Sequence, residues 1–125
     1  MSDEIAESAG GETVAVVALT TVDGDFDAVG MARTLVERGL ASCVNVVPGI
    51  TSVYRWEERI KADPEQQLII KTTAGRVEAL SAAIHELHPY DIPEFIVLPI
   101  TGGSEKYLRF LRQGEDYLRS LKELD

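Results

Sequence analysis

The chain of 125 residues has a single cysteine, Cys43, and it has far fewer basic residues than acidic ones, 12 against 21. One cysteine excludes an internal disulfide framework and a metal cage built from several thiolates. The net charge of −9 repels phosphate backbones and anionic lipid, and the arginines and lysines are scattered among acids rather than gathered in a patch. The composition therefore argues against nucleic acid and membrane surfaces as partners.

Long apolar runs and targeting signals are missing as well. No run approaches the roughly 20 apolar residues that a transmembrane helix needs. The start, MSDEIAESAGGE, is acidic and small, without the cationic start and apolar core of a secretion signal. We therefore expect a disordered acidic tail at residues 1–12 and a single domain at residues 13–125 of a cytoplasmic protein. The sequence also lacks G-x-G-x-x-G, P-loop and G-x-S-x-G motifs, so it specifies neither a nucleotide site nor a serine nucleophile.

The first half of the sequence alternates between strand and helix patterns. The β-branched run at residues 13–21 predicts a strand, and the acids of VDGDFD can cap the helix expected at 26–38. Gly39 is the expected left-handed stop of that helix. Its apolar face is expected at the helically spaced positions Val29, Ala32, Val36 and Leu40.

A long extended stretch follows at residues 41–56, interrupted by Pro48-Gly49. A proline inside a strand belongs at an edge or a bulge, so we expect an irregularity there. Residues 57–66, EERIKADPEQ, are predicted to turn the chain. Residues 67–73, QLIIKTT, then return as a buried strand.

The second half predicts helix, strand and helix. One apolar stripe, formed by Val77, Leu80, Ile84 and Leu87, predicts a helix that Pro89 ends. The continuous apolar run FIVLPI, residues 95–100, is typical of a strand covered on both faces. Ser104 can cap a final helix, in which Gly114 is a candidate break.

The order of elements is β-α-β-β-α-β followed by a helix. Two split βαβ units with right-handed crossovers give a four-stranded antiparallel sheet with both helices on one face. The predicted fold is therefore α+β, a ferredoxin-like sandwich with an extended hairpin and a C-terminal helix. Many unrelated functions use this fold, so it names none by itself.

The hairpin is too long for its own domain. Residues 41–56 reach roughly 50 Å at about 3.3 Å per residue, whereas the second predicted helix covers only about 18 Å. The projecting part carries apolar residues, including Val53, Tyr54, Trp56 and Ile60. Exposed apolar surface with open strand edges favours self-association, so we expect an oligomer in which neighbours cover the hairpin. The alternative is a hairpin that curls back over its own sheet.

The segment HELHPY holds both histidines, His85 and His88. They are three residues apart, not four as on an H-E-x-x-H zinc helix, and His88 lies at the break before Pro89. His88 is either part of a polar site or a helix-end residue that binds the last carbonyls. Glu94 is either a carboxylate at the rim of a site or a solvated strand start, and Cys43 is expected to be an inert packed thiol.

Three motifs stand in order along the chain: ARTLVERGLASCVNVVPGITSVYRWE, LIIKTT, and LHPYDIPEFIVLPI followed by YLRFL. Through them residues 13–112 resemble the CutA family of divalent-cation tolerance proteins. The resemblance implies a ferredoxin-like homotrimer with hairpins that cross between subunits, similar to the trimeric PII signalling proteins, whose ligands sit in clefts between subunits. It also implies a role in tolerance of copper and other divalent metals, with no established enzyme activity.

The match to metal-binding members of that family is partial. Those members place a cysteine near the end of the first strand and consecutive histidines before the PY pair, where this chain has Thr20 and Leu87-His88. His88 is thus the one candidate metal ligand that remains, for copper or another divalent cation. Glu57-Glu58 stands at the hairpin tip, where relatives often have a glycine, so the turn type is expected to differ.

The resemblance also indicates which side chains line a cleft between subunits. They combine aromatic walls, one cation and one carboxylate, which suits a metal ion or a small anionic ligand. The expected function is a trimeric cytoplasmic binding or regulatory protein of copper tolerance, and not an enzyme. The alternatives are an enzyme that uses His88 and Glu94 as an acid–base pair, and a structural trimerisation module. Besides His88, the expected lining residues are Tyr54, Trp56, Lys71, Tyr90 and Glu94.

Overall fold

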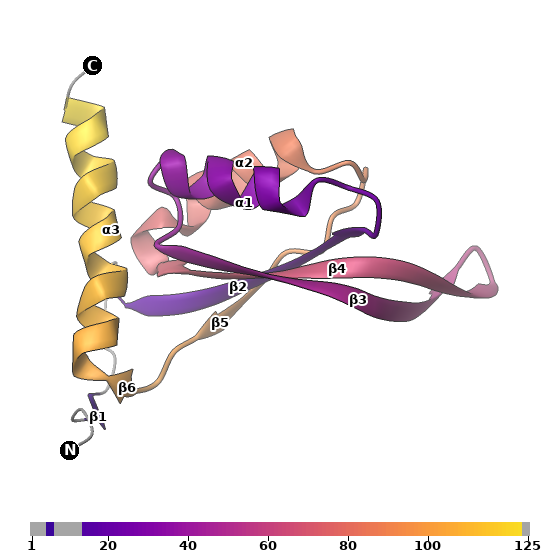
Figure 1. The fold of residues 1–125 in the computed structure, drawn as a ribbon, viewed down its shortest axis with the longest axis horizontal. Helices are drawn as coiled ribbons and strands as arrows, with labels where there is room; N and C mark the ends of the chain where they lie inside the picture. The colour runs from indigo at the N-terminus through magenta and orange to yellow at the C-terminus, as the bar shows by residue number, and fades with distance from the viewer. Residues whose placement is uncertain (1–4, 7–13, 124–125) are drawn as a thin grey trace.

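A computed structural model describes residues 5–6 and 14–123 of the chain. Four antiparallel strands form one sheet in the order β3-β4-β2-β5, and α1 and α2 lie together on one of its faces (Figure 1). The helix α3 stands across one end of the sheet. The bounds are β1 Ile5–Ala6, β2 Ala15–Asp23, α1 Ala28–Glu37, β3 Cys43–Trp56, β4 Arg59–Thr73, a 3₁₀ turn Ala74–Arg76, α2 Val77–Leu87, β5 Ile96–Pro99, β6 Gly103–Ser104 and α3 Glu105–Glu123.

The predicted ferredoxin-like fold is confirmed, because β2-α1-β3-β4-α2-β5 follows the expected order around a mixed helix and sheet sandwich. The tail expected at residues 1–12 lies outside the described residues except for β1. That short strand pairs with β6, Ile5 opposite Ser104. The disorder expected for the tail therefore stays a prediction.

The helix ends follow the local signals in the sequence. Asp27 caps α1, and its carboxylate accepts a hydrogen bond of 2.9 Å from the Gly30 amide. Gly39 follows with a φ of 75°, a left-handed conformation that glycine adopts without strain. His88 is extended at the end of α2, as expected for the residue before Pro89. The Ser104 hydroxyl accepts from the Tyr107 amide at the start of α3.

The predicted buried face of α1 was correct at Ala32 and Leu40, which are buried, and wrong at Val29 and Val36. The side chains of Val29 and Val36 are 58% and 42% exposed. The stripe that faces the sheet is centred away from the two valines and combines alanines with two residues larger than valine. That stripe is Ala28, Met31, Ala32 and Leu35.

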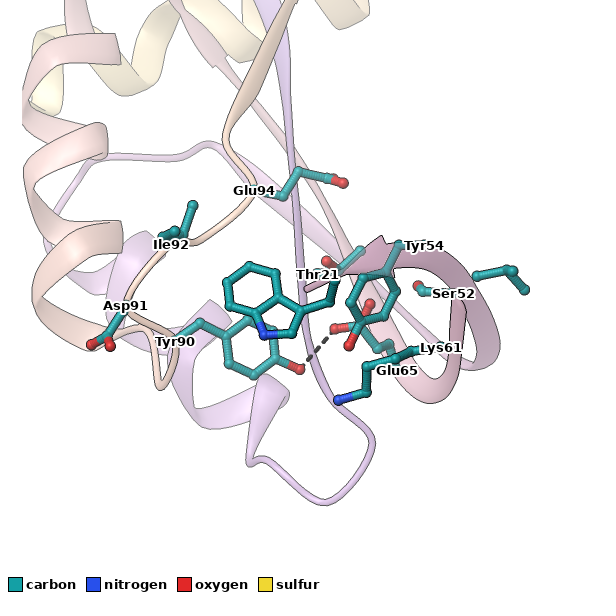
Figure 2. Close-up of a pocket in the computed structure, with 11 residues that line it drawn as sticks. Thr21, Ser52, Tyr54, Lys61, Glu65, Tyr90, Asp91, Ile92 and Glu94 are labelled. Atoms are coloured by element: carbon teal, nitrogen blue, oxygen red, sulfur yellow. Dashed lines mark hydrogen bonds between the residues drawn. The ribbon is translucent and has the colours of Figure 1, made fainter. Parts of the chain in front are cut away.

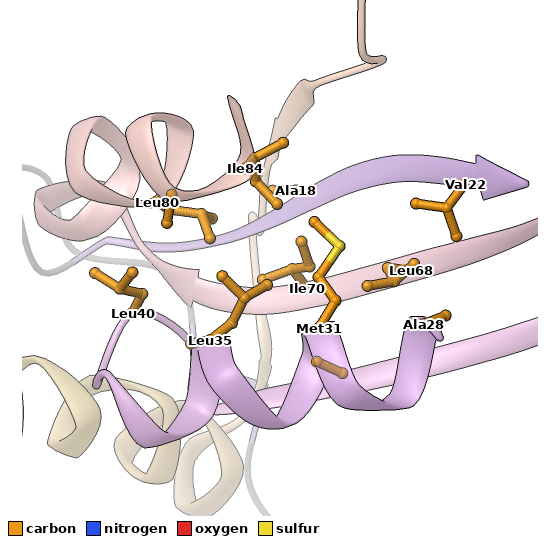
Figure 3. Packing of buried hydrophobic residues seen from close by; sticks show 13 residues of the cluster. Ala18, Val22, Ala28, Met31, Leu35, Leu40, Leu68, Ile70, Leu80 and Ile84 are labelled. Atoms are coloured by element: carbon orange, nitrogen blue, oxygen red, sulfur yellow. The ribbon is translucent and has the colours of Figure 1, made fainter. Parts of the chain in front are cut away.

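The core lies between the two helices and the sheet (Figure 3). The sheet supplies residues at alternate positions of β2 and β4, since successive side chains point to opposite faces. Burying each large aliphatic side chain stabilises the fold by about 1.5–3 kcal/mol. The largest buried aliphatic residues of this cluster are Val22, Leu35, Leu68, Ile70, Leu80 and Ile84.

The hairpin of β3 and β4 has strands of 14 and 15 residues and projects well past α1 and α2 (Figure 1). Its turn is only Glu57-Glu58, both with positive φ, 49° and 67°. The prediction that residues 57–66 form a turn was therefore wrong. Two glutamates do not signal the tight turn with two positive φ values, which usually holds Asn-Gly. The irregularity expected at Pro48-Gly49 is present as a register shift between Val47 and Ile50.

The sheet face that the helices leave open has an apolar region around β2 and β5. On β2, Val17 and Leu19 alternate with core residues, and they pair with Leu98 and Ile96 of β5. The side chains of Ile96 and Leu98 are each 46% exposed. The cover expected on both faces of β5 is thus not supplied by the described part of this chain.

A buried arginine fastens α3 to the rest of the domain. Arg76 is fully buried, and its guanidinium donates to the Leu111 carbonyl at 2.7 Å, the Ser42 hydroxyl at 2.8 Å and the Thr73 hydroxyl at 3.1 Å. Gly114 lets the helix approach this group, because a Cβ there would lie 2.4 Å from both Arg76 Nη1 and Ser42 Oγ. The helix runs unbroken through Gly114, so the break considered there does not occur.

We predict that Gly114→Ala destabilises the protein. Helix propensity alone would favour alanine by about 1 kcal/mol. The new methyl group would instead displace the buried Arg76 group, and overpacking of this kind costs about 1–3 kcal/mol. Urea unfolding at a fixed protein concentration measures the change. The control is Gln113→Ala, which alters an exposed neighbour on the same helix, and equal stability of both variants would contradict the close packing.

Candidate functional site

A pocket of about 900 Å³ lies where the hairpin meets the connection between α2 and β5 (Figure 2). Its volume is in the range of small-molecule sites. Three strands and one loop contribute, so the pocket joins residues far apart in the sequence. The lining residues are Thr21, Ser52, Val53, Tyr54, Trp56, Lys61, Glu65, Tyr90, Asp91, Ile92 and Glu94.

Apart from Val53, the strand residues of the pocket belong to the open face of the sheet. In β2, Thr21 follows the alternation of Val17 and Leu19, and in β4, Glu65 follows that of Ile69. Tyr54 pairs with Lys61 across the hairpin, so both lie on one face. The pocket therefore opens on the side that α1 and α2 leave uncovered.

The hairpin side of the pocket is held by a small polar group. The Tyr54 hydroxyl donates a hydrogen bond to the Asp63 carboxylate, and this bond raises the pKa of Tyr54. The Lys61 ammonium is 3.8 Å from the same carboxylate and 5.9 Å from the centre of the Tyr54 ring. Lys61 thus already has an anionic and an aromatic partner within its own hairpin.

The inner side of the pocket is acidic. Glu65 is only 8% exposed and accepts a 2.7 Å hydrogen bond from the Tyr90 hydroxyl (Figure 2). Burial, together with that hydrogen bond, raises the pKa of Tyr90. Burial and the charge of Glu65 also raise the pKa of Glu94. An additional negative charge on this side of the pocket is therefore unfavourable, because little positive charge offsets it.

His88 lies behind the pocket rather than in its lining. It is 8% exposed, its Nε2 is 2.7 Å from the Thr21 carbonyl, and its Nδ1 accepts from the Tyr90 amide at 3.1 Å. These partners assign a neutral ring with the proton on Nε2. Burial lowers the pKa of His88. His88 therefore ties the loop that carries Tyr90 to the strand that carries Thr21, and it acts as a positioning residue for this wall.

The single chain does not fit a divalent metal at this site. Both nitrogens of His88 have partners within the chain, so ligation would break one of two hydrogen bonds. Within residues 14–123, no three His, Cys, Asp or Glu side chains form a group that could hold a metal ion. Metal binding by His88 stays a prediction, and it would need further ligands from outside this single chain.

The structure brings four of the expected cleft residues together, since Tyr54, Trp56, Tyr90 and Glu94 all line the pocket. Lys71 does not. It lies opposite Cys43 on β3, and its ammonium is 5.7 Å from the centre of the Tyr107 ring. The expectation of an anionic ligand depended on Lys71, so the pocket lacks the cation assumed for it.

Three charged lining residues, Lys61, Glu65 and Asp91, were missed in the sequence. Lys61 and Glu65 lie in the segment interpreted as a turn, which is the first half of β4. The signal that could have found them is the register itself. With a two-residue turn after Trp56, Lys61 falls opposite Tyr54 and Glu65 opposite Ile50, in one register that changes only beyond Ile50, at the shift toward Val47.

Fold and site define the class of protein: a ferredoxin-like domain with a ligand-sized pocket beside a projecting hairpin. Residues 16–114 match the family described as CutA1 divalent ion tolerance protein. The chain belongs to this family. In the described part of the chain, no helix has both the length and the apolar character needed to span a bilayer.

Relatives and solved structures agree with this assignment. The chain is 46% identical over 97 residues to "Protein CutA, chloroplastic" of Arabidopsis thaliana, covering 78% of this chain but 53%, about half, of that protein. It is 44% identical over 97 residues to the divalent-cation tolerance protein CutA of Thermus thermophilus, covering 78% of this chain and 94% of that protein. A structure of CutA from Synechococcus elongatus, described as complexed with a Bis-Tris molecule, is 37% identical with a TM-score of 0.78, over 89% of this chain and 99% of that one. The PII-like protein CutA from Nostoc gives a TM-score of 0.72 at 31% identity, over 79% and 95%.

We predict that His88 makes the protein less stable in acid. Its lowered pKa means that the folded state favours the neutral ring more than the unfolded chain does. The stabilisation is complete above the unfolded pKa of about 6.5 and is lost as the pH falls through the lower folded pKa. The difference in free energy of unfolding between wild type and His88→Gln should therefore narrow on acidification, as measured by urea unfolding from pH 7.5 to pH 5.

The matched control is His85→Gln, which removes the other imidazole of the chain from an exposed position on α2. An equal narrowing in this control, or no narrowing for His88→Gln, would show that the buried ring is not the source of the acid sensitivity.

Proposed function

We propose that the protein is a cytoplasmic homotrimer that binds a small ligand in a cleft between subunits and contributes through that binding to tolerance of copper and other divalent metals. The observation that carries this proposal is the position of the pocket. It opens on the apolar sheet face that the chain itself leaves uncovered. A neighbouring subunit that covers this face would close the pocket.

The exposed surface supports self-association. Ile96 and Leu98 on β5 lie on the open face, while Val53, Trp56 and Ile60 are exposed on the hairpin. Exposed apolar patches of this kind are typical of interfaces. β5 is also an edge strand of the sheet, with unpaired backbone groups that another chain can cover.

A small organic ligand fits the pocket better than a bound metal. The CutA structure from Synechococcus elongatus is described as complexed with Bis-Tris, an amine that bears hydroxyl groups. The pocket of this chain offers aromatic walls and carboxylates suited to such a molecule. The proposed link to copper is therefore regulatory, and a copper site would need ligands from more than one subunit.

An acid–base enzyme receives no support from the geometry. His88 does not line the pocket, and both its nitrogens bind backbone groups. A general base must reach the proton that it abstracts. The arrangement supports a binding role for the pocket and a positioning role for His88.

We predict that the purified protein sediments as three chains of 13.7 kDa at micromolar concentration. Leu98→Asp should shift the distribution to smaller species, because a carboxylate on the open face would be buried without a partner. Val29→Asp is the matched control, since it places the same charge on an exposed residue of α1 on the helix side of the molecule. A wild-type monomer, or dissociation of both variants alike, would overturn the trimer.

We also predict that Bis-Tris binds the trimer and that Trp56→Ala weakens its binding, as measured by isothermal titration calorimetry in a buffer free of amines. In parallel titrations with Cu²⁺ and Zn²⁺, His88→Gln should bind each metal with the same affinity as the wild type, because both ring nitrogens of His88 are already hydrogen-bonded within the chain. Absence of binding by Bis-Tris and by every smaller cation, alcohol and acid tested would contradict the proposed cleft. A loss of metal affinity in His88→Gln would instead assign His88 to a metal site.

A further inference from the structure

The charges that line the pocket are unbalanced. Its ionisable carboxylates are Glu65, Asp91 and Glu94, and its one cationic side chain is Lys61. Lys61 is within 3.8 Å of Asp63, a fourth acid that adjoins the pocket. The lysine charge is therefore shared with Asp63, and among the residues that the structure describes Glu65 and Glu94 have no ion pair with a cation.

Burial makes this imbalance significant. Glu65 is almost wholly buried and has the neutral hydroxyl of Tyr90 as its partner. The charge of Glu65 disfavours ionisation of both neighbours, because it raises the pKa of Glu94 and of Tyr90 in addition to the effect of burial. A positive group placed among them would reduce this repulsion, and a negative group would increase it.

The walls of the pocket add a second, independent preference. Tyr54, Trp56 and Tyr90 supply three aromatic rings. The face of an aromatic ring attracts a cation, most strongly for tryptophan, and this attraction contributes about 0.5–2 kcal/mol for each favourable contact. Aromatic rings do not coordinate a divalent metal, and residues 14–123 provide no group of three metal ligands. Carboxylates with aromatic walls suit an organic cation rather than a bare metal ion.

We propose that the pocket takes a small organic ammonium ion, with its positive group toward Glu65 and Glu94 and its apolar part against the aromatic walls. This inference rests on the proposed ligand cleft and specifies the chemical class of its occupant. It replaces the small anion expected when Lys71 was placed in the cleft. Lys71 lies near Tyr107 instead.

Three molecules of similar shape and different charge test the proposal. Neopentylammonium, neopentyl alcohol and pivalate share a tert-butyl group and carry a positive, zero and negative charge at pH 7. Trp56 is the only tryptophan of the chain and lines the pocket, so its fluorescence reports binding directly. We expect neopentylammonium to bind the wild-type trimer at least tenfold more tightly than the alcohol, and pivalate to bind more weakly than either.

Charge-removing variants locate the effect. Glu65→Gln keeps an acceptor for the Tyr90 hydroxyl but removes the charge, and it should lower the affinity for neopentylammonium about tenfold with little change for the alcohol. Glu94→Gln at the less buried position provides the same test if the Glu65 variant folds poorly. Glu37→Gln is the control, because it changes the net charge equally from an exposed site on α1 outside the pocket.

The outcomes separate the two proposals. Equal binding of the three molecules, tighter binding of pivalate, or equal losses in Glu65→Gln and Glu37→Gln would overturn the cationic ligand and leave the cleft in place. Binding of Bis-Tris without binding of neopentylammonium would do the same. If neither Bis-Tris nor any of the three molecules binds, the cleft itself fails.

Discussion

The sheet of this protein has helices on one face only, and most features of the molecule depend on that constraint. Its covered face holds the core between β2, β4 and the helices α1 and α2. Its other face presents Ile96 and Leu98 and continues into a hairpin that outruns both helices (Figure 1). Apolar surface of this extent is unfavourable in water, and this is the physical ground for the proposed assembly.

The pocket belongs to the same uncovered face, so in the proposed trimer subunit association and ligand binding would involve the same surface. Its inner wall is built on one connected group, in which His88 binds the Thr21 carbonyl and the Tyr90 amide, and Tyr90 in turn binds Glu65. The segment HPYDIPE is therefore a rigid joint between α2 and β5 and also a wall of the site. A ligand that altered Tyr90 or Glu65 would act where a neighbouring subunit is expected, and this gives a binding protein a physical route to regulation.

Local signals predicted the fold well, and long-range pairing limited what they said about the site. Asp27, Gly39 and Pro89 set helix ends through interactions within a few residues, so the sequence alone was sufficient for them. The face of α1 was misjudged at two positions because Val29 and Val36 also recur at helical spacing, whereas the larger Met31 and Leu35 are the residues that pack. Lys61 and Glu65 were missed because a tight turn of two glutamates has no clear sequence signature. The first half of β4 was therefore interpreted as part of the turn, and its pairing with β3 was not predicted.

By itself, the sequence determined the order of elements, the projecting hairpin and the family, because these depend on local propensity and on motifs that are contiguous in the chain. Only the tertiary structure decided which charges share the pocket. Side chains from three strands and one loop meet there through the register of the hairpin, which moves Lys71 away and brings Glu65 in. The tertiary structure also decided that the imidazole of His88 is already hydrogen-bonded, since its partner, the Thr21 carbonyl, is 67 residues distant along the chain. Contacts over such separations are fixed by folding and leave no local trace.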